Sequence, residues 1–396
     1  MTQTSASDEK IPFWRDERFW RIALQIMAVV VVVVIFSLLV GNLNRSLQQQ
    51  GRQFDFSFLF NEAGFNIGES VIPYTPNDRY YWAFVVGLVN TLRLILVGFV
   101  LTTLLGTIAG VASFSENWLV RKISLVYVEL VRNVPLLLQL FIWYFGIFYT
   151  LSRSSGTGAN PPPNQLFGAV FINRKGIVIP WPPNTAVSWI SLILLIGATV
   201  VAIVLWRWRI KLMEEQGASG KPQLMALLAL GMVALLLLTF GLGWQFPQLT
   251  ESNDIEGGLR MSLEYAAVLG GLVFYTGAFI AEIVRAGIQA VSKGQWEAAR
   301  ALGLQPGLVM RLVVLPQALR VIIPSLNSQY MNLAKNSSLA LAIGYPDIFS
   351  SAATTLNQAG RSVEVILIIA ATYLIINLII SVVMNTLNQT VQLKER

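Results

Sequence analysis

Charged side chains set inside long apolar runs are the residues of this chain with the clearest capacity for chemistry. Arg93, Glu264 and Lys335 each lie in such a run, and Asn336 follows Lys335 directly. Ionisable residues in membrane-crossing segments are costly to insert and by default indicate a functional site. Lys335 has no carboxylate close to it in the sequence, so two interpretations stay open: it belongs to a site, or its side chain extends to the outer membrane interface.

Two further pairs of charges invite a simpler explanation. Glu129 and Arg132 are three residues apart, and so are Glu282 and Arg285. Residues at this spacing lie on one face of a helix, where opposite charges attract each other. We therefore predict a local ion pair within each helix.

Missing residue types exclude several classes of site. The chain contains neither cysteine nor histidine, which excludes disulfides, thiol catalysis and histidine-based metal or acid–base chemistry. The pattern G-x-x-x-x-G-K-[ST] occurs nowhere, so the chain has no Walker A loop for ATP. We expect no catalytic residue, no metal and no cofactor, and therefore a protein that is not itself an enzyme.

The elements that must position these charges are membrane spans. Only 12% of the residues are charged and the mean hydropathy is +0.61, whereas soluble domains carry about 25% charged residues. Eight stretches have about the length that crosses a bilayer, which predicts an all-α integral membrane protein. We place them at 20–41, 82–113, 125–150, 188–206, 223–244, 259–284, 313–341 and 363–386. Pro316 and Pro324 interrupt the seventh, which predicts a broken helix of the kind that lines a cavity.

The distribution of positive charge sets the orientation. The formal net charge is +7, which we attribute to the positive-inside bias of membrane proteins rather than to nucleic acid binding. Seventeen of the 28 lysines and arginines fall on one side, eight on the other and three within spans, which favours two cytoplasmic termini. Of the outer segments, 42–81 is polar, and 151–187 is rich in Gly, Pro and Asn and is expected to resist regular structure.

One predicted cytoplasmic segment, 282–316, has the pattern of a docking element. Its middle consists mostly of strong helix formers and predicts a short helix from Lys293 to Gly303, with Gly303 as the stop and Pro306 shortly after. Ala298 and Ala299 are expected to be exposed small residues that allow close approach to another protein, with charges on either side to set register. An ordinary amphipathic helix on the membrane surface is the alternative.

The same segment resembles the EAA loop of bacterial ABC importer permeases. Glu297, Ala298 and Ala299 are followed at matching distances by Gly303 and by Val313-x-Leu315-Pro316, where the family usually has Ile in place of Val313. The strings KGQWEAARALGL at 293–304, LPQALR at 315–320, YVELVRNVPLL at 127–137 and GLVNTL at 87–92 are similar to those of the polar amino acid permease branch. The resemblance covers 82–150 and 259–390.

This resemblance implies a type I importer permease core with a cytoplasmic coupling helix in the bacterial inner membrane. It divides the chain into a tail (1–19), an extra span with a periplasmic segment (20–81), two core parts (82–150 and 259–390), an inserted loop with a pair of spans (151–258) and a second tail (391–396). The layout is similar to the larger permease subunit of broad-specificity L-amino acid importers. The implied ATPase-coupling residues are Lys293, Gly294, Trp296, Glu297, Ala298, Ala299, Arg300, Leu302 and Gly303.

The resemblance also implies partners and a substrate. The partners would be an ABC ATPase subunit, a second and different permease subunit, a periplasmic amino acid-binding protein and the lipid membrane, and not nucleic acid. An amino acid zwitterion needs a cation for its carboxylate and a carboxylate for its ammonium, and Arg93, Lys335 and Glu264, with Asn336, are candidates for that pathway. Two alternatives are an ion-coupled secondary transporter, which leaves the EAA-like loop unexplained, and a membrane scaffold. The sequence names neither the amino acids carried nor the role of 151–258.

Overall fold

The computed structural model describes residues 17–49, 51, 53–153, 162–216, 219–251 and 253–391. In this described part, seven helices are long and apolar enough to cross a membrane, or eight if one bent pair counts as a single span. The predicted fold class is therefore confirmed. The predicted cytoplasmic ends, 1–16 and 392–396, lie outside the described residues.

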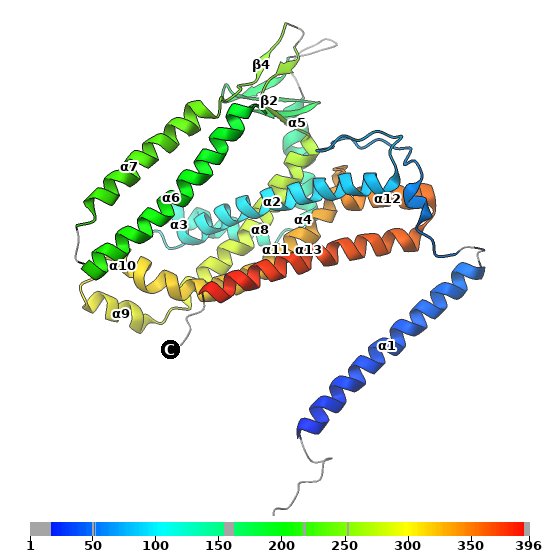
Figure 1. Cartoon of the computed structure of the whole chain (residues 1–396), viewed down its shortest axis with the longest axis horizontal. Helices are drawn as coiled ribbons and strands as arrows, with labels where there is room; N and C mark the ends of the chain where they lie inside the picture. Colours follow the sequence, from blue (N-terminus) through cyan, green and yellow to red (C-terminus); the bar gives the residue numbers. More distant parts are fainter. Residues whose placement is uncertain are drawn as a thin grey trace, which may run out of the picture.

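Two long helices, α2 (Tyr80–Ala112) and α8 (Leu263–Gln289), pack side by side at the centre of the bundle. Figure 1 shows α11 and α13 against this pair and α1 standing apart from the other helices. The remaining helical elements outside the broken third span and the seventh span are α1 (Glu17–Gln49), η2 (Ser57–Phe60), α6 (Ala186–Gln216), α7 (Lys221–Leu236), η4 (Leu237–Gly241), α9 (Lys293–Ala301), α12 (Ile348–Ala359) and α13 (Ser362–Val391).

Glycines bring α2 and α8 together. A Cβ added to Gly106 would lie 2.5 Å from Cβ of Ile280 and 2.8 Å from the carbonyl oxygen of Gly277. At Gly110 the same atom would lie 2.7 Å from Cβ of Val284. Without a hydrophobic driving force between helices in lipid, close approach at small residues is the main source of association.

We expect Gly106→Ala to lower the free energy of unfolding by about 1–3 kcal/mol, because the methyl group meets backbone and a β-branched side chain that cannot move aside. Gly197→Ala is the matched control: Gly197 lies within α6 and has open space around it, so the change should be neutral or slightly stabilising. Thermal unfolding of the detergent-purified protein measures both. Equal melting temperatures for the two variants would contradict the packing argument.

The third span is bent by 108°. It consists of α3 (Trp118–Arg132), α4 (Leu136–Phe141), η3 (Ile142–Phe148) and α5 (Tyr149–Ser152). Pro135 stands at the break, where it disfavours helix for the residue before it. Gln139 stabilises the bend, because its Nε2 donates to the carbonyls of Val131 (2.8 Å) and Val134 (2.9 Å), which have lost helical partners. The residues of the predicted span 125–150 therefore form two helical segments at a sharp angle rather than one straight helix.

The seventh span, in contrast, is continuous, and the expectation of a helix broken at Pro316 and Pro324 is wrong. The span runs from Pro306 to Ile343 through four elements: α10 (Pro306–Val309), η5 (Met310–Val314), α11 (Leu315–Asn336) and η6 (Ser337–Ile343). The turn η5, directly before Pro316, is π-helical. A π turn changes the hydrogen-bond register and accommodates a proline without ending the helix.

A small β-sheet stands beyond one end of the bundle, next to the starts of α6 and α8 (Figure 1). Its antiparallel strands follow the order β1 (Asn164–Leu166), β2 (Val170–Asn173), β3 (Gly176–Ile179) and β6 (Leu259–Met261), and a separate pair joins β4 (Gln248–Leu249) to β5 (Ile255–Glu256). The expectation that 151–187 resists regular structure is therefore wrong for these strands. An exposed ion pair of Lys175 with Asp254 (2.7 Å) joins the two sheets and lowers the pKa of Asp254.

Candidate functional site

The short helix α9 occupies the segment that the sequence singled out, and it runs from Lys293 to Ala301. Trp296 and Ala299 turn inward and join an apolar cluster with Ile288 of α8, Val314 of η5 and Ala318 of α11. Gln317 of α11 donates to Gln295 of α9 at 3.4 Å. A force applied to α9 would thus reach α8 and α11 through packed side chains.

The end of α9 is a Schellman motif. Gly303 has a φ of +76°, its N–H donates to the carbonyl of Arg300 (2.9 Å), and the N–H of Leu304 donates to the carbonyl of Ala299 (3.3 Å). Only glycine adopts this conformation without strain. The predicted role of Gly303 as the helix stop is therefore confirmed in structure, and the geometry fixes the direction in which the chain leaves α9.

The outer face of α9 is small and charged, and no other described part of the chain covers it. Lys293, Gly294, Glu297, Ala298 and Arg300 are exposed. Leu302, directly after the helix, is 81% exposed, so almost its whole apolar side chain faces away from the described part of the chain. One part of the expectation is wrong: of the two alanines predicted to be exposed, Ala299 is buried and packs against the bundle.

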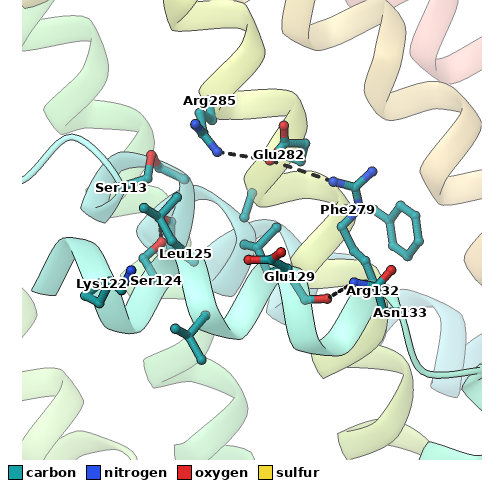
Figure 2. Close-up of a pocket in the computed structure, with 15 residues that line it drawn as sticks. Ser113, Lys122, Ser124, Leu125, Glu129, Arg132, Asn133, Phe279, Glu282 and Arg285 are labelled. Atoms are coloured by element: carbon teal, nitrogen blue, oxygen red, sulfur yellow. Dashed lines mark hydrogen bonds and ion pairs between the residues drawn. The ribbon is translucent and has the colours of Figure 1, made fainter.

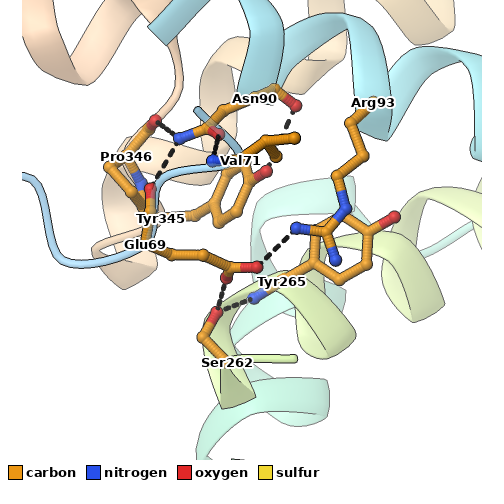
Figure 3. Close-up of polar contacts among 8 residues, drawn as sticks. All are labelled: Glu69, Val71, Asn90, Arg93, Ser262, Tyr265, Tyr345 and Pro346. Atoms are coloured by element: carbon orange, nitrogen blue, oxygen red, sulfur yellow. Dashed lines mark hydrogen bonds and ion pairs between the residues drawn. The ribbon is translucent and has the colours of Figure 1, made fainter. Parts of the chain in front are cut away.

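A polar cluster ties together the other end of the bundle (Figure 3). Glu69 of the segment before α2 accepts from Arg93 Nη1 at 2.5 Å and also from the hydroxyl of Ser262, the N-cap of α8. Arg93 lies over the Tyr265 ring, 3.9 Å from its centroid. The Arg93 and Glu69 side chains are only 22% and 16% exposed. We call this group, with Asn90 and Tyr345, the outer polar cluster.

Asn90 extends the outer polar cluster to a second chain segment. Its Nδ2 donates to the carbonyls of Glu69 and Pro346, both at 2.8 Å, and Tyr345 donates to the Asn90 carbonyl at 3.1 Å. The cluster therefore connects α2, α8 and the loop before α12, and it orders the segment around Glu69 against all three.

The predicted pathway residues are not brought into one site by any contact among the described residues. Arg93 is held by Glu69, and Glu264 accepts a hydrogen bond from the Tyr144 hydroxyl at 2.7 Å. Lys335 is exposed and forms no ion pair with any residue that the structure describes, and Asn336 beside it is half-buried. Lys335 ends a stripe of exposed residues on α11, namely Pro316, Arg320, Pro324, Ser328, Asn332 and Lys335.

A pocket of about 600 Å³ lies between α3 and α8 (Figure 2). Charged side chains line it: Glu282 lies 3.8 Å from both Arg285 and Arg132, and Arg132 also faces the ring of Phe279. The predicted local pair of Glu282 with Arg285 is confirmed. The predicted pair of Glu129 with Arg132 is wrong, because Arg132 instead reaches across to Glu282 on the neighbouring helix.

Sequence reasoning missed Glu69 and the contact of Arg132 with Glu282. Glu69 lies in a polar segment without periodicity, and its partner is 24 positions away along the chain. The contact between α3 and α8 joins residues 150 positions apart. Arg93 lies inside an apolar run with no carboxylate close to it in the sequence. That was the signal that a carboxylate from another segment should lie near it in the fold.

Comparisons with known proteins agree with this arrangement. Residues 232–393 match a family model described as binding-protein-dependent transport system inner membrane component. The putative amino-acid ABC transporter permease protein YhdX of Escherichia coli (strain K12) is 43% identical over 380 residues, which cover 94% of both chains.

Two further relatives match over nearly their whole length. The general L-amino acid transport system permease protein AapQ of Rhizobium johnstonii is 37% identical, over 96% of this chain and 94% of the relative. The glutamate/glutamine/aspartate/asparagine transport system permease protein BztB of Rhodobacter capsulatus is 40% identical, over 96% of both chains. The similarity therefore includes the inserted sheet and the helices α6 and α7.

Proposed function

This chain belongs to the family of amino acid ABC transporter permeases, and we propose that it forms one half of the translocation pathway of an ATP-driven importer and receives the force of the ATPase at α9. It is a multi-pass membrane protein with a type I permease fold. The observation that carries the proposal is the structure of α9: an exposed face with Glu297, Ala298 and Leu302, and a buried face packed onto α8 and α11.

The chemistry of the reaction lies outside this chain in this proposal. An ABC ATPase subunit binds and hydrolyses the nucleotide, and its movement displaces α9. Because Trp296 and Ala299 are packed into the same cluster as Ala318 of α11, displacement of α9 changes the position of α11. The role of this chain is mechanical coupling and solute passage, with both termini on the cytoplasmic side.

The exposed stripe of α11 supports a shared pathway. Arg320, Ser328, Asn332 and Lys335 are polar residues on a membrane-spanning helix, and the residues that the structure describes leave them exposed. Polar groups facing lipid are costly, so we propose that a second permease subunit covers the stripe and that the solute passes between the two. Lys335 is the cation proposed to meet the carboxylate of the solute, with Asn336 beside it.

The other pathway candidates take different roles in this proposal. Glu264, at the first turn of α8 and held by Tyr144, is proposed to meet the ammonium group at a different stage of solute passage from Lys335, because no contact among the described residues brings the two side chains together. Arg93 already has a carboxylate partner in Glu69, so it positions the outer end of the pathway rather than the solute. The names of the relatives support L-amino acids, including glutamate, aspartate and their amides, as the substrate class, delivered by a periplasmic binding protein.

Uptake by the purified complex in proteoliposomes tests the proposed function. The chain is reconstituted with its second permease and ATPase subunits, and radiolabelled amino acids are offered with the binding protein outside. We expect uptake only with ATP inside, and a loss of about tenfold or more for Lys335→Met, because a charged hydrogen bond to the carboxylate is removed. Uptake driven by a proton or sodium gradient without ATP would contradict the proposal.

A further inference from the structure

A cluster of arginine and tryptophan side chains lies where the inserted helix α6 meets the segment after α9. We define the inner arginine cluster as Arg207 and Arg209 of α6 and Arg311 of η5. Arg207 follows Trp206 in the chain and lines the same groove, and the other two arginines face the Trp206 ring. The guanidinium carbons of Arg209 and Arg311 lie 5.4 Å and 5.8 Å from the centre of the Trp206 ring. In Figure 1 this end of α6 lies near α10, the element directly before η5, which agrees with the contact of Arg311 with Trp206.

Among the side chains that the structure describes, no carboxylate pairs with the positive charges of this cluster. Within the described residues, none of Arg207, Arg209 and Arg311 forms an ion pair. Arg209 donates only to the carbonyl of Gly220, at 3.1 Å. Two guanidinium groups lie near one ring, and Arg207, the residue after Trp206, adds a third positive charge at the groove. Like charges repel one another, so the arrangement favours a bound anion.

An apolar groove of about 360 Å³ begins at the cluster and runs between α6 and α7. It is lined by Thr199, Ala202, Ile203, Trp206, Arg207 and Leu227. Every lining residue except Arg207 is uncharged and mostly apolar, so the groove has a charged mouth and a hydrophobic body. Trp206 and Trp208 are both exposed, as expected for tryptophan at the level of lipid headgroups.

We propose that the groove and the inner arginine cluster bind an anionic phospholipid, with one acyl chain between α6 and α7 and the headgroup phosphate at Arg207 and Arg311. Cationic pockets between transmembrane helices on the cytoplasmic side suit such headgroups, because the local lipid surface is negative. A free anion would satisfy the arginines and leave the apolar groove without an occupant. A zwitterionic lipid would fill the groove and leave the excess positive charge uncompensated.

The position of Arg311 gives this site a consequence for the importer. Arg311 belongs to η5, between the coupling helix α9 and the pathway helix α11, whereas Arg207 belongs to the inserted pair of helices. A phosphate shared by Arg207 and Arg311 ties the inserted helices to the segment that moves with α9. The lipid is therefore a structural bridge between α6 and η5.

Native mass spectrometry of the delipidated complex, titrated separately with phosphatidylglycerol, phosphatidylcholine and inorganic phosphate, tests the proposal. Each arginine near a negative lipid surface contributes about a fivefold change in binding. We expect Arg207→Gln and Arg311→Gln each to weaken phosphatidylglycerol binding about fivefold, and the double variant about 25-fold, with phosphatidylcholine binding unchanged. Arg121→Gln, an exposed arginine outside the cluster, is the matched control and should have no effect.

A second pair of variants tests the groove without changing the charge. Ala202→Trp fills the groove and should weaken phosphatidylglycerol binding tenfold or more, whereas Val200→Trp places the same bulk on the exposed side of α6 and should not. If Arg207→Gln and Arg121→Gln bound phosphatidylglycerol equally well, lipid binding would not depend on the inner arginine cluster. That result would overturn the proposal. The proposal would also be overturned if inorganic phosphate displaced the lipid. It would likewise be overturned if the variants caused a protein subunit, and not the lipid, to dissociate.

Discussion

Replacing Leu302 by aspartate is expected to lower ATP-driven uptake about 30-fold or more while leaving the chain folded. Leu302 is 81% exposed, so its replacement removes almost no packing within this chain. As an apolar anchor beside small residues, it has the character of an interface hot spot, whose loss costs about 2 kcal/mol or more in binding. A buried carboxylate at the interface would add an unpaired charge. Uptake and the amount of copurified ATPase subunit measure the effect.

Phe167→Asp is the control for the Leu302 variant. Phe167 is 99% exposed at the turn between β1 and β2, and it lies on the sheet at the opposite end of the bundle from α9 (Figure 1). Its replacement introduces the same charge but should leave the ATPase subunit bound. If Leu302→Asp retained the ATPase subunit and normal uptake, α9 would not be the docking element.

Removing one charge of the outer polar cluster should be the most damaging single substitution for stability. Arg93→Met leaves the Glu69 carboxylate largely buried with only the Ser262 hydroxyl as a side-chain partner. Breaking a buried ion pair on one side costs about 3–5 kcal/mol, and because both side chains keep some exposure we expect about 2–4 kcal/mol. Adding Glu69→Gln to the Arg93→Met variant removes the unpaired carboxylate charge. The double variant should therefore regain most of the lost free energy of unfolding. Thermal unfolding of the single and double variants gives the coupling energy.

The exposed ion pair of Lys175 with Asp254 provides the comparison for Arg93. Both of its side chains are more than half exposed, and such surface pairs contribute about 0–1 kcal/mol. Lys175→Met should therefore change the melting temperature little. Equal losses for Lys175→Met and Arg93→Met would show that the outer polar cluster does not hold the bundle together.

Local signals in the sequence were sufficient for the spans and for α9. Hydropathy located the spans because the bilayer fixes the length of an apolar helix. Gly303 and Pro306 marked the end of α9 because a left-handed glycine and a following proline are local requirements of helix termination. The burial of Ala299 could not be predicted from neighbouring residues, because it depends on which face of α9 packs against η5. Two adjacent alanines show no periodicity that would identify the buried face.

The missed strands depend on contacts between segments far apart in the chain, whereas the misjudged helix breaks depend on local hydrogen bonds that the proline pattern alone does not reveal. The strands have two to four residues each, too few for alternation to be visible, and β3 pairs with β6 across the whole inserted pair of helices. Pro316 and Pro324 were expected to break a helix, but the π turn before Pro316 accommodates the first. The actual break at Pro135 depends on Gln139, whose side chain replaces two lost backbone partners.

Cysteine cross-linking tests most directly the claim that α9 receives the force of an ATPase. The chain has no native cysteine, so Ala298→Cys carries a single thiol on the exposed face of α9, and a short bifunctional maleimide can join it to a cysteine introduced in the ATPase subunit. We predict a cross-link from Ala298→Cys in the reconstituted complex, with a yield that changes when ATP is added, and none from a cysteine at Phe167. A cross-link to the periplasmic binding protein, or none to the ATPase subunit in a complex active in uptake, would contradict the account.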